Sequence, residues 1–129
     1  MIELRNITMR YAMAGTVITV LRDLDFSVAA RERVAIVGPS GSGKTTLLLL
    51  MTGLEQAQAG SVRINGNALE SMNRDQRADL RRTEIGIVFQ SFHLIPSLTA
   101  RENVALPLDI AGVGGSSARA DEMLSRVGL

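Results

Sequence analysis

Eight consecutive residues have the types and spacing of a phosphate-binding loop. They fit the pattern G-x-x-x-x-G-K-[ST] in full and run Gly38-Pro39-Ser40-Gly41-Ser42-Gly43-Lys44-Thr45. Glycines let successive backbone N–H groups turn inward without a Cβ atom in the way, so such a loop forms an anion-binding nest. Lys44 can reach the β- and γ-phosphates, the Thr45 hydroxyl can bind Mg²⁺, and Thr46 can contact the α-phosphate. The loop therefore predicts binding of ATP with Mg²⁺.

The alternative interpretation of this stretch is a glycine-rich turn without a ligand. The flanking residues favour the binding loop. Val34–Val37 is a short β-branched run, typical of a strand buried on both faces. Lys44–Leu54 is rich in helix formers and apolar nearly all round, which indicates a buried helix. A strand that enters the loop and a helix that leaves it are the surroundings that a phosphate-binding loop requires.

The remaining elements are predicted from periodicity, turn residues and caps. Strands are expected at Ile2–Tyr11, at Gly60–Ile64 and at Ile85–Phe89. A further strand region covers Thr16–Leu21 and Leu24–Val28, which are separated by Arg22-Asp23. A tight turn is expected at Asn65-Gly66. A first helix is expected at Asn73–Arg82, with Asn73 as its N-cap. A second should begin at a capping box, Thr99–Glu102, and kink or end near Pro107. After a flexible linker at Gly112–Ser117, the apolar stripe Ala120, Met123, Leu124 and Val127 predicts a third, amphipathic helix.

Composition narrows the classes of protein. The 129 residues are 46% apolar and 21% charged, which is typical of a globular domain. A net charge of +1 gives no electrostatic case for a nucleic-acid partner, and the absence of cysteine suits the cytosol. Glu3 and Arg5 stand where a signal peptide would be apolar, and the run Leu47–Met51 is far shorter than the roughly 20 residues of a membrane span. If this protein serves a membrane, we expect it to do so from outside the bilayer.

The chain resembles the ATP-binding subunit of ABC transporters, most closely the branch that serves lipoprotein-release and macrolide-export systems. The resemblance covers essentially the whole chain and is carried by Gly38–Thr46, Ile87–Gln90, Thr99–Val104 and Leu106–Leu108. It implies an α/β fold: a P-loop NTPase (RecA-like) core with an N-terminal antiparallel β region, an incomplete sheet and the start of a helical subdomain. The implied domains are residues 1–90 and 91–129.

The resemblance also implies roles for single residues. Tyr11 stands where the family stacks an aromatic ring on adenine; the alternative is an aromatic packed in the core. Gln90 stands at the Q-loop, where its amide would contact Mg²⁺ and the attacking water. Lys44 and Gln90 are thus the implied catalytic residues, and Thr45 and Gln90 the metal ligands. The implied partners are a membrane permease and a second ATP-binding subunit in a head-to-tail dimer, at the inner face of the cell membrane.

Three features of the family's second half are not found in these residues. The family needs a strand ending in Asp-Glu, a Ser-Gly-Gly signature and a switch histidine; Asp121-Glu122, Gly114-Gly115 and His93 do not fit those positions. The sequence is therefore expected to be a truncated copy, not competent by itself for hydrolysis and marginally folded because its apolar strand edges stay open. Two alternatives stay open: a non-hydrolysing nucleotide-binding fragment, and the head of a nucleic-acid-processing ATPase of the same superfamily.

Overall fold

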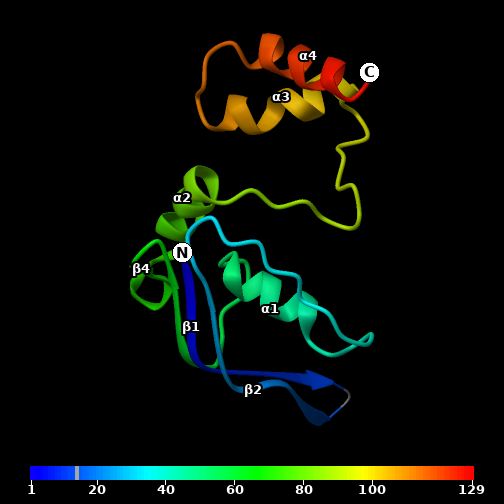
Figure 1. Cartoon of the computed structure of the whole chain (residues 1–129). Coiled ribbons are helices and arrows are strands. Elements are labelled where there is room, and N and C mark those ends of the chain that lie inside the picture. The colour runs from blue at the N-terminus through cyan, green and yellow to red at the C-terminus, as the bar shows by residue number, and fades with distance from the viewer. Residues whose placement is uncertain (14) are drawn as a thin grey trace. The chain divides into compact units, whose positions relative to one another are not determined.

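The computed structural model describes residues 1–13 and 15–129 and divides them into two compact units, Met1–Gly86 and Ile87–Leu129 (Figure 1). The functional division expected after Gln90 stays a prediction.

A long β-hairpin opens the first unit. Strand β1 (Ile2–Met13) pairs antiparallel with β2 (Thr16–Val28), from Ile2 opposite Val28 to Met13 opposite Thr16. Both predicted strand regions are confirmed, and the expected interruption is a bulge within one continuous strand. At the bulge Asp23 has a φ of 45°, and its N–H donates to Thr8 Oγ1 at 3.3 Å.

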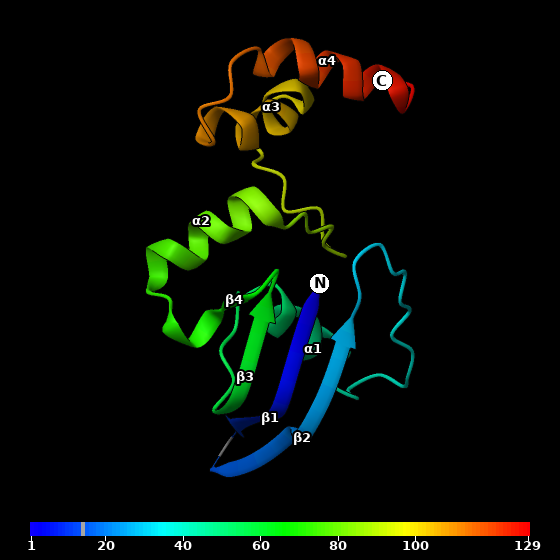
Figure 2. The same ribbon diagram turned by 60° about the vertical axis from the view of Figure 1, so that its left-hand side comes forward.

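Strands β3 (Ala59–Ile64) and β4 (Asn67–Ala68) complete an antiparallel sheet of order β2-β1-β3-β4, part of which is seen in Figure 2. The tight turn at Asn65-Gly66 is confirmed, with φ values of 48° and 85°. Two positive φ values in a two-residue turn match the right-handed twist of the flanking strands.

The core of the first unit lies where helix α1 (Lys44–Met51) packs against the sheet. It consists of Leu4, Ile7, Met9, Leu47, Leu50, Met51, Val62, Ile64, Leu69 and Leu80. The helix predicted to run to Leu54 ends at Met51, and the expectation of burial nearly all round was wrong, since Leu48 is 51% exposed. An apolar face needs a neighbouring layer to be buried, and the described residues cover only one side of α1.

Two expected strands do not form. Val34–Val37 and Ile85–Phe89 are neither strand nor helix, and Val37 and Val88 are 86% and 100% exposed. Neither run pairs with a described strand, so neither has the ladder of hydrogen bonds that a strand requires. Ile36 and Ile85 still pack against the core. The expectation of an incomplete sheet agrees with this arrangement.

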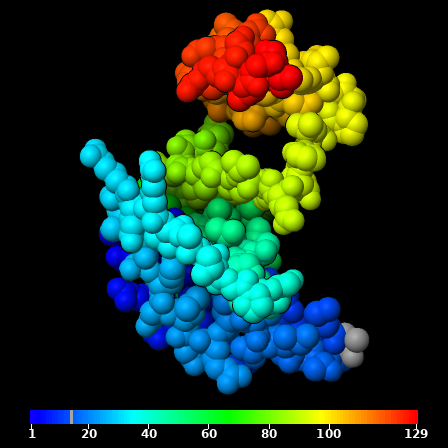
Figure 3. Space-filling model, turned by 45° about the vertical axis from the view of Figure 1, so that its right-hand side comes forward, coloured from blue at the N-terminus to red at the C-terminus, as the bar shows by residue number. Residues whose placement is uncertain are grey.

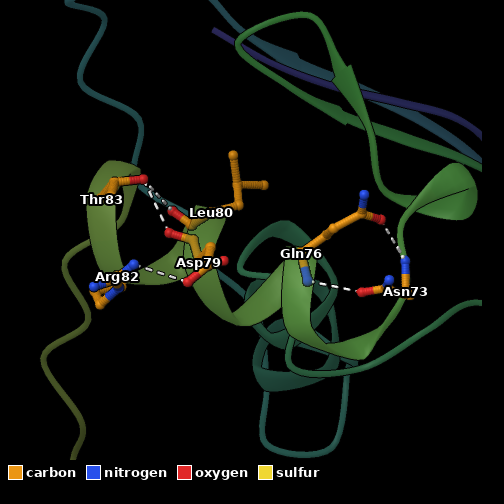
Figure 4. Close-up of polar contacts among 6 residues, drawn as sticks. All are labelled: Asn73, Gln76, Asp79, Leu80, Arg82 and Thr83. Atoms are coloured by element: carbon orange, nitrogen blue, oxygen red, sulfur yellow. Dashed lines mark hydrogen bonds and ion pairs between the residues drawn. The ribbon is translucent and has the colours of Figure 1, made fainter. Parts of the chain in front are cut away.

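A short 3₁₀ turn, η1 (Leu69–Ser71), leads to helix α2 (Arg74–Glu84). The predicted cap is confirmed: Asn73 Oδ1 accepts from Gln76 N at 2.9 Å, and Gln76 Oε1 accepts from Asn73 N at 2.9 Å (Figure 4). This reciprocal pair satisfies two of the free N–H groups at the helix start. Leu80 is the buried residue of α2.

The second unit is a pair of helices, α3 (Ala100–Ile110) and α4 (Ser116–Arg126), whose Ala105 and Ala120 are buried. The capping box at Thr99 and Glu102 is confirmed. Helix α3 continues three residues beyond Pro107, since a proline removes one hydrogen bond without forbidding the next turn. The expected linker is shorter than predicted: α4 already begins at Ser116, after Gly115 with a φ of 76°.

Candidate nucleotide-binding site

The phosphate-loop residues lie in the exposed connection between β2 and α1, drawn in cyan on the surface in Figure 3. An extended segment enters the loop at Val37, and α1 begins at Lys44, where Leu47 N donates to Gly43 O at 2.8 Å. The loop is closed on itself by Ser42 N, which donates to Pro39 O at 3.3 Å. The order of loop and helix is therefore the one that the sequence predicts.

Lys44 folds its side chain back over this loop. Its ammonium nitrogen Nζ donates to Gly38 O at 2.9 Å and Pro39 O at 2.6 Å, and lies 3.5 Å from Ser42 Oγ. The positive charge is thus held over the loop. Since the bonds are to neutral carbonyl oxygens, they leave that charge uncompensated, and an anion at the loop would meet it directly.

Two glycines fit the loop closely. A Cβ atom on Gly43 would lie 3.0 Å from Val20 Cγ1, 3.1 Å from Leu21 Cδ2 and 3.2 Å from Val20 O, and the φ of Gly43 is 87°. A Cβ atom on Gly38 would lie 2.9 Å from Ser42 Oγ. Gly41 has a φ of 79° with open space around it. Glycine at these positions allows the loop to turn and, at Gly43, to lie close against β2.

The start of α1 has no side-chain cap. Gly43 is the N-cap residue and offers no oxygen to the first N–H groups of the helix. By contrast, Asn73 and Thr99 cap α2 and α3 with full capping boxes. The uncapped N–H groups and the helix dipole make this end of α1 electropositive, the usual setting for a bound phosphate.

The remaining loop side chains are polar and accessible. Ser40 and Thr45 are exposed and Thr46 is half-buried. Among the described residues, neither threonine hydroxyl has a hydrogen-bond partner. Both hydroxyls are therefore available to a ligand or a metal ion at the start of α1.

Tyr11 and Gln90, the two candidate site residues outside the phosphate loop, have different surroundings. Tyr11 is half-buried, lies opposite Ile18 in the β1–β2 hairpin and packs against the core. The same hairpin contacts Gly43 through Val20 and Leu21, a proximity that spacing along the sequence does not reveal. Gln90 belongs to the second unit and is exposed there.

The residues that do not fit the family's remaining motifs have other contacts or roles. Asp121 forms an ion pair with Arg101 between α4 and α3. His93 packs edge-to-face on Phe89, with ring centroids 4.7 Å apart. Gly115 is the N-cap residue of α4. Each of these groups thus has a role within the second unit.

Comparison with known proteins decides the family. The sequence profile of the family described as ABC transporter matches residues 21–129. The chain belongs to the ABC transporter family. Among curated proteins, this ABC transporter chain is 43% identical over its full length to the macrolide export ATP-binding/permease protein MacB of Marinobacter nauticus, covering 20% of that protein. It is equally 43% identical to the methionine import ATP-binding protein MetN 1 of Rhodococcus jostii, covering 38%.

Solved structures agree with the fold. The chain resembles a dimeric post-hydrolysis state of the ATP-binding cassette MJ0796, bound to ADP and Pi, with a TM-score of 0.89 and 39% identity. The match covers 97% of this chain and 56% of that one. A second dimeric structure of the same bacterial cassette gives a TM-score of 0.90. The chain thus spans about a fifth of MacB, 38% of MetN 1 and just over half of the cassette.

In the described part of the chain, no helix has the length and apolar character required to cross a bilayer.

Proposed function

We propose that residues Gly38–Thr46 bind ATP together with Mg²⁺. The observation that carries the proposal is the uncapped start of α1 beneath a loop whose single lysine folds over it. A triphosphate is the ligand that this arrangement suits, because it supplies negative charge to Lys44 and acceptors to the free N–H groups. The loop residues suit a triphosphate, since a Cβ atom at Gly38 would crowd Ser42 inside the loop and one at Gly43 would crowd β2.

Within this proposal each residue has a defined task. Lys44 exchanges its two carbonyl acceptors for β- and γ-phosphate oxygens, and Thr46 contacts the α-phosphate. The Thr45 hydroxyl would hold Mg²⁺, which when bound would neutralise charge on the phosphate oxygens. Gln90 as a metal ligand stays a prediction from the family resemblance. Tyr11 offers its ring to the adenine base from the hairpin against which Gly43 packs.

The wider role we propose is that of an energy-coupling ATP-binding part of a transporter. It would work at the inner face of the cell membrane with a permease and a second ATP-binding copy. Support comes from the names of the relatives, one an ATP-binding/permease protein, and from the dimeric state of the similar cassette. Because an exporter and an importer are equally similar, the direction of transport is not part of the proposal.

The test is a calorimetric titration of the chain with Mg²⁺-ATP. Lys44 is the only lysine, so Lys44→Ala removes the one ammonium side chain. We expect that variant to bind roughly ten- to a hundredfold more weakly, since charge-assisted hydrogen bonds are lost. Arg82→Gln, an exposed charge on α2 paired with Asp79, is the matched control and should keep its affinity. Equal affinities for wild type and Lys44→Ala would refute binding at this loop.

An ATP-turnover assay on the same sample tests hydrolysis separately. We expect the 129 residues alone to bind without turnover. Asp121-Glu122 is the only Asp-Glu pair, and it lies on exposed α4 with Asp121 held by Arg101. Turnover that is abolished by Lys44→Ala would show that the described residues contain a sufficient catalytic group.

A further inference from the structure

A second cationic feature of the first unit lies on α2, apart from the phosphate loop. Arg74, Arg77 and Arg81 follow one another at helical spacing and, with residues 53–56, line a hollow of about 350 Å³. No residue of Gly38–Thr46 lines it. Its volume lies within the range of about 300–1,000 Å³ that is usual for small-ligand sites.

Two of these arginines are held in place by the loop that follows α1. The guanidinium of Arg77 donates to Gln56 Oε1 at 2.9 Å, and that of Arg81 donates to Gly53 O at 2.9 Å. Both side chains are half-buried. A guanidinium has five N–H donors in a planar fork, so each arginine keeps further donors for a ligand.

The charge of these arginines is not compensated. Among the described residues the ion pairs are Arg82–Asp79 and Arg101–Asp121, and none involves an arginine of the hollow. Glu55 is the one acidic residue of the lining. Three cations and one anion leave two positive charges, in a chain whose overall net charge is only +1.

We propose that this hollow binds a phosphate monoester group. A phosphate monoester carries nearly two negative charges at neutral pH and three strong acceptor oxygens, which match the uncompensated charge and the converging forks. A single carboxylate has one charge and two oxygens and would leave part of the site unsatisfied. The group can belong to a soluble phosphate compound or to a lipid headgroup, and the experiment separates these sources.

The experiment follows the arginine and backbone resonances of the ¹⁵N-labelled chain during titration with inorganic phosphate at constant ionic strength. It is done with Lys44→Ala, which weakens binding at the phosphate loop. We expect saturable shifts at Gly53–Gln56 and at the side chains of Arg77 and Arg81. Arg82 should not shift, because it is paired with Asp79 (Figure 4).

Arg74→Gln is the variant that tests the site most cleanly. Within the described residues Arg74 has no hydrogen bond or ion pair through its side chain, so its loss should leave the fold unchanged. We expect about tenfold weaker phosphate binding from it, and no change from the control Arg82→Gln. The pair Arg77→Lys and Arg81→Lys, which keeps charge and removes the fork, should also weaken binding.

Absence of saturable shifts, or equal effects of Arg74→Gln and Arg82→Gln, would overturn the proposal. So would shifts caused by an Asp/Glu peptide but not by phosphate, which would assign the hollow to an acidic protein segment. Sedimentation with vesicles of phosphatidylcholine, with or without phosphatidic acid, identifies the source. If the chain sediments with the vesicles only when they contain phosphatidic acid and only when Arg74 is present, the source is a lipid headgroup. If the chain binds phosphate but does not sediment with the vesicles, the source is a soluble compound.

Discussion

At the scale of single residues, Gly43 joins the loop to the rest of the first unit. It caps α1, has a left-handed φ, and approaches Val20 and Leu21 within ordinary contact limits only because it lacks a side chain. A left-handed conformation costs an L-residue roughly 1–2 kcal/mol, and the contact with Val20 O adds to that cost because backbone cannot move aside easily. Gly43 therefore serves the fold and the site together.

We predict that Gly43→Ala lowers the free energy of unfolding by about 1–2 kcal/mol or more. Urea denaturation of the variant and wild type, followed by circular dichroism, measures the difference. Gly86→Ala is the control, because a Cβ atom there meets nothing within 4 Å and its φ is not in the left-handed region. Equal losses in the two variants would show that Gly43 does not contact β2 as described.

The sequence was a good guide to which loop residues matter and a poor guide to their contacts. The glycine and lysine spacing is local, so the pattern could be read directly. The bonds from Lys44 Nζ to Gly38 O and Pro39 O depend on how the loop folds, and the contact of Gly43 with Val20 joins residues far apart in the chain. The arginines of α2 were visible as charges, but their convergence on residues 53–56 was not.

At the scale of elements, the capping box of α3 links a charge to a helix. Glu102 accepts from the N–H of Thr99 and from its hydroxyl, both at 2.7 Å. These hydrogen bonds hold the pKa of the Glu102 carboxyl below its usual range. Since the folded pKa is the lower one, the stabilisation is complete above the ordinary glutamate pKa and is lost as the pH falls through the folded value.

We predict that the start of α3 frays on acidification, in the range below the ordinary pKa of glutamate. Amide shifts of residues 99–103 during an NMR pH titration measure the effect, and the carboxyl of Glu102 should titrate below the ordinary range of a glutamate. Glu102→Gln keeps an acceptor without a charge, so it should remove the pH dependence from this end. A midpoint for Glu102 at the ordinary glutamate value would argue against the capping box.

Helix starts were the elements best predicted from the sequence. The caps at Asn73 and Thr99 need only residues three apart, so local spacing suffices. Helix ends were predicted less well, because α1 ends earlier than its composition suggests and α3 continues past Pro107. Burial of a helix face also depends on distant neighbours, which explains the exposure of Leu48.

At the scale of the whole molecule, the main error concerned Val34–Val37 and Ile85–Phe89. Both runs have the composition of strands, and neither forms one. A β-branched run has only a preference for the extended conformation. It forms a strand when a neighbouring strand supplies hydrogen bonds along its length. β3 contains similar residues and does form a strand, because Val62 lies opposite Leu4 of β1.

Hydrogen exchange tests this difference between like sequences. The backbone N–H groups of Val34–Val37 and Ile87–Phe89 have no backbone acceptor among the described residues, so we predict exchange close to the rate of an open chain. The amides of β3 that pair with β1 should be strongly protected from exchange, although β3 contains residue types similar to those of Val34–Val37. Val34 and Val62 are the same residue type. The N–H of Val62 donates to the Glu70 carboxylate, whereas that of Val34 has no acceptor among the described residues, so Val62 should exchange more slowly. Protection at Val34–Val37 equal to that of β3 would mean that these residues pair as a strand after all, and that the sheet of the first unit is wider than the four strands described.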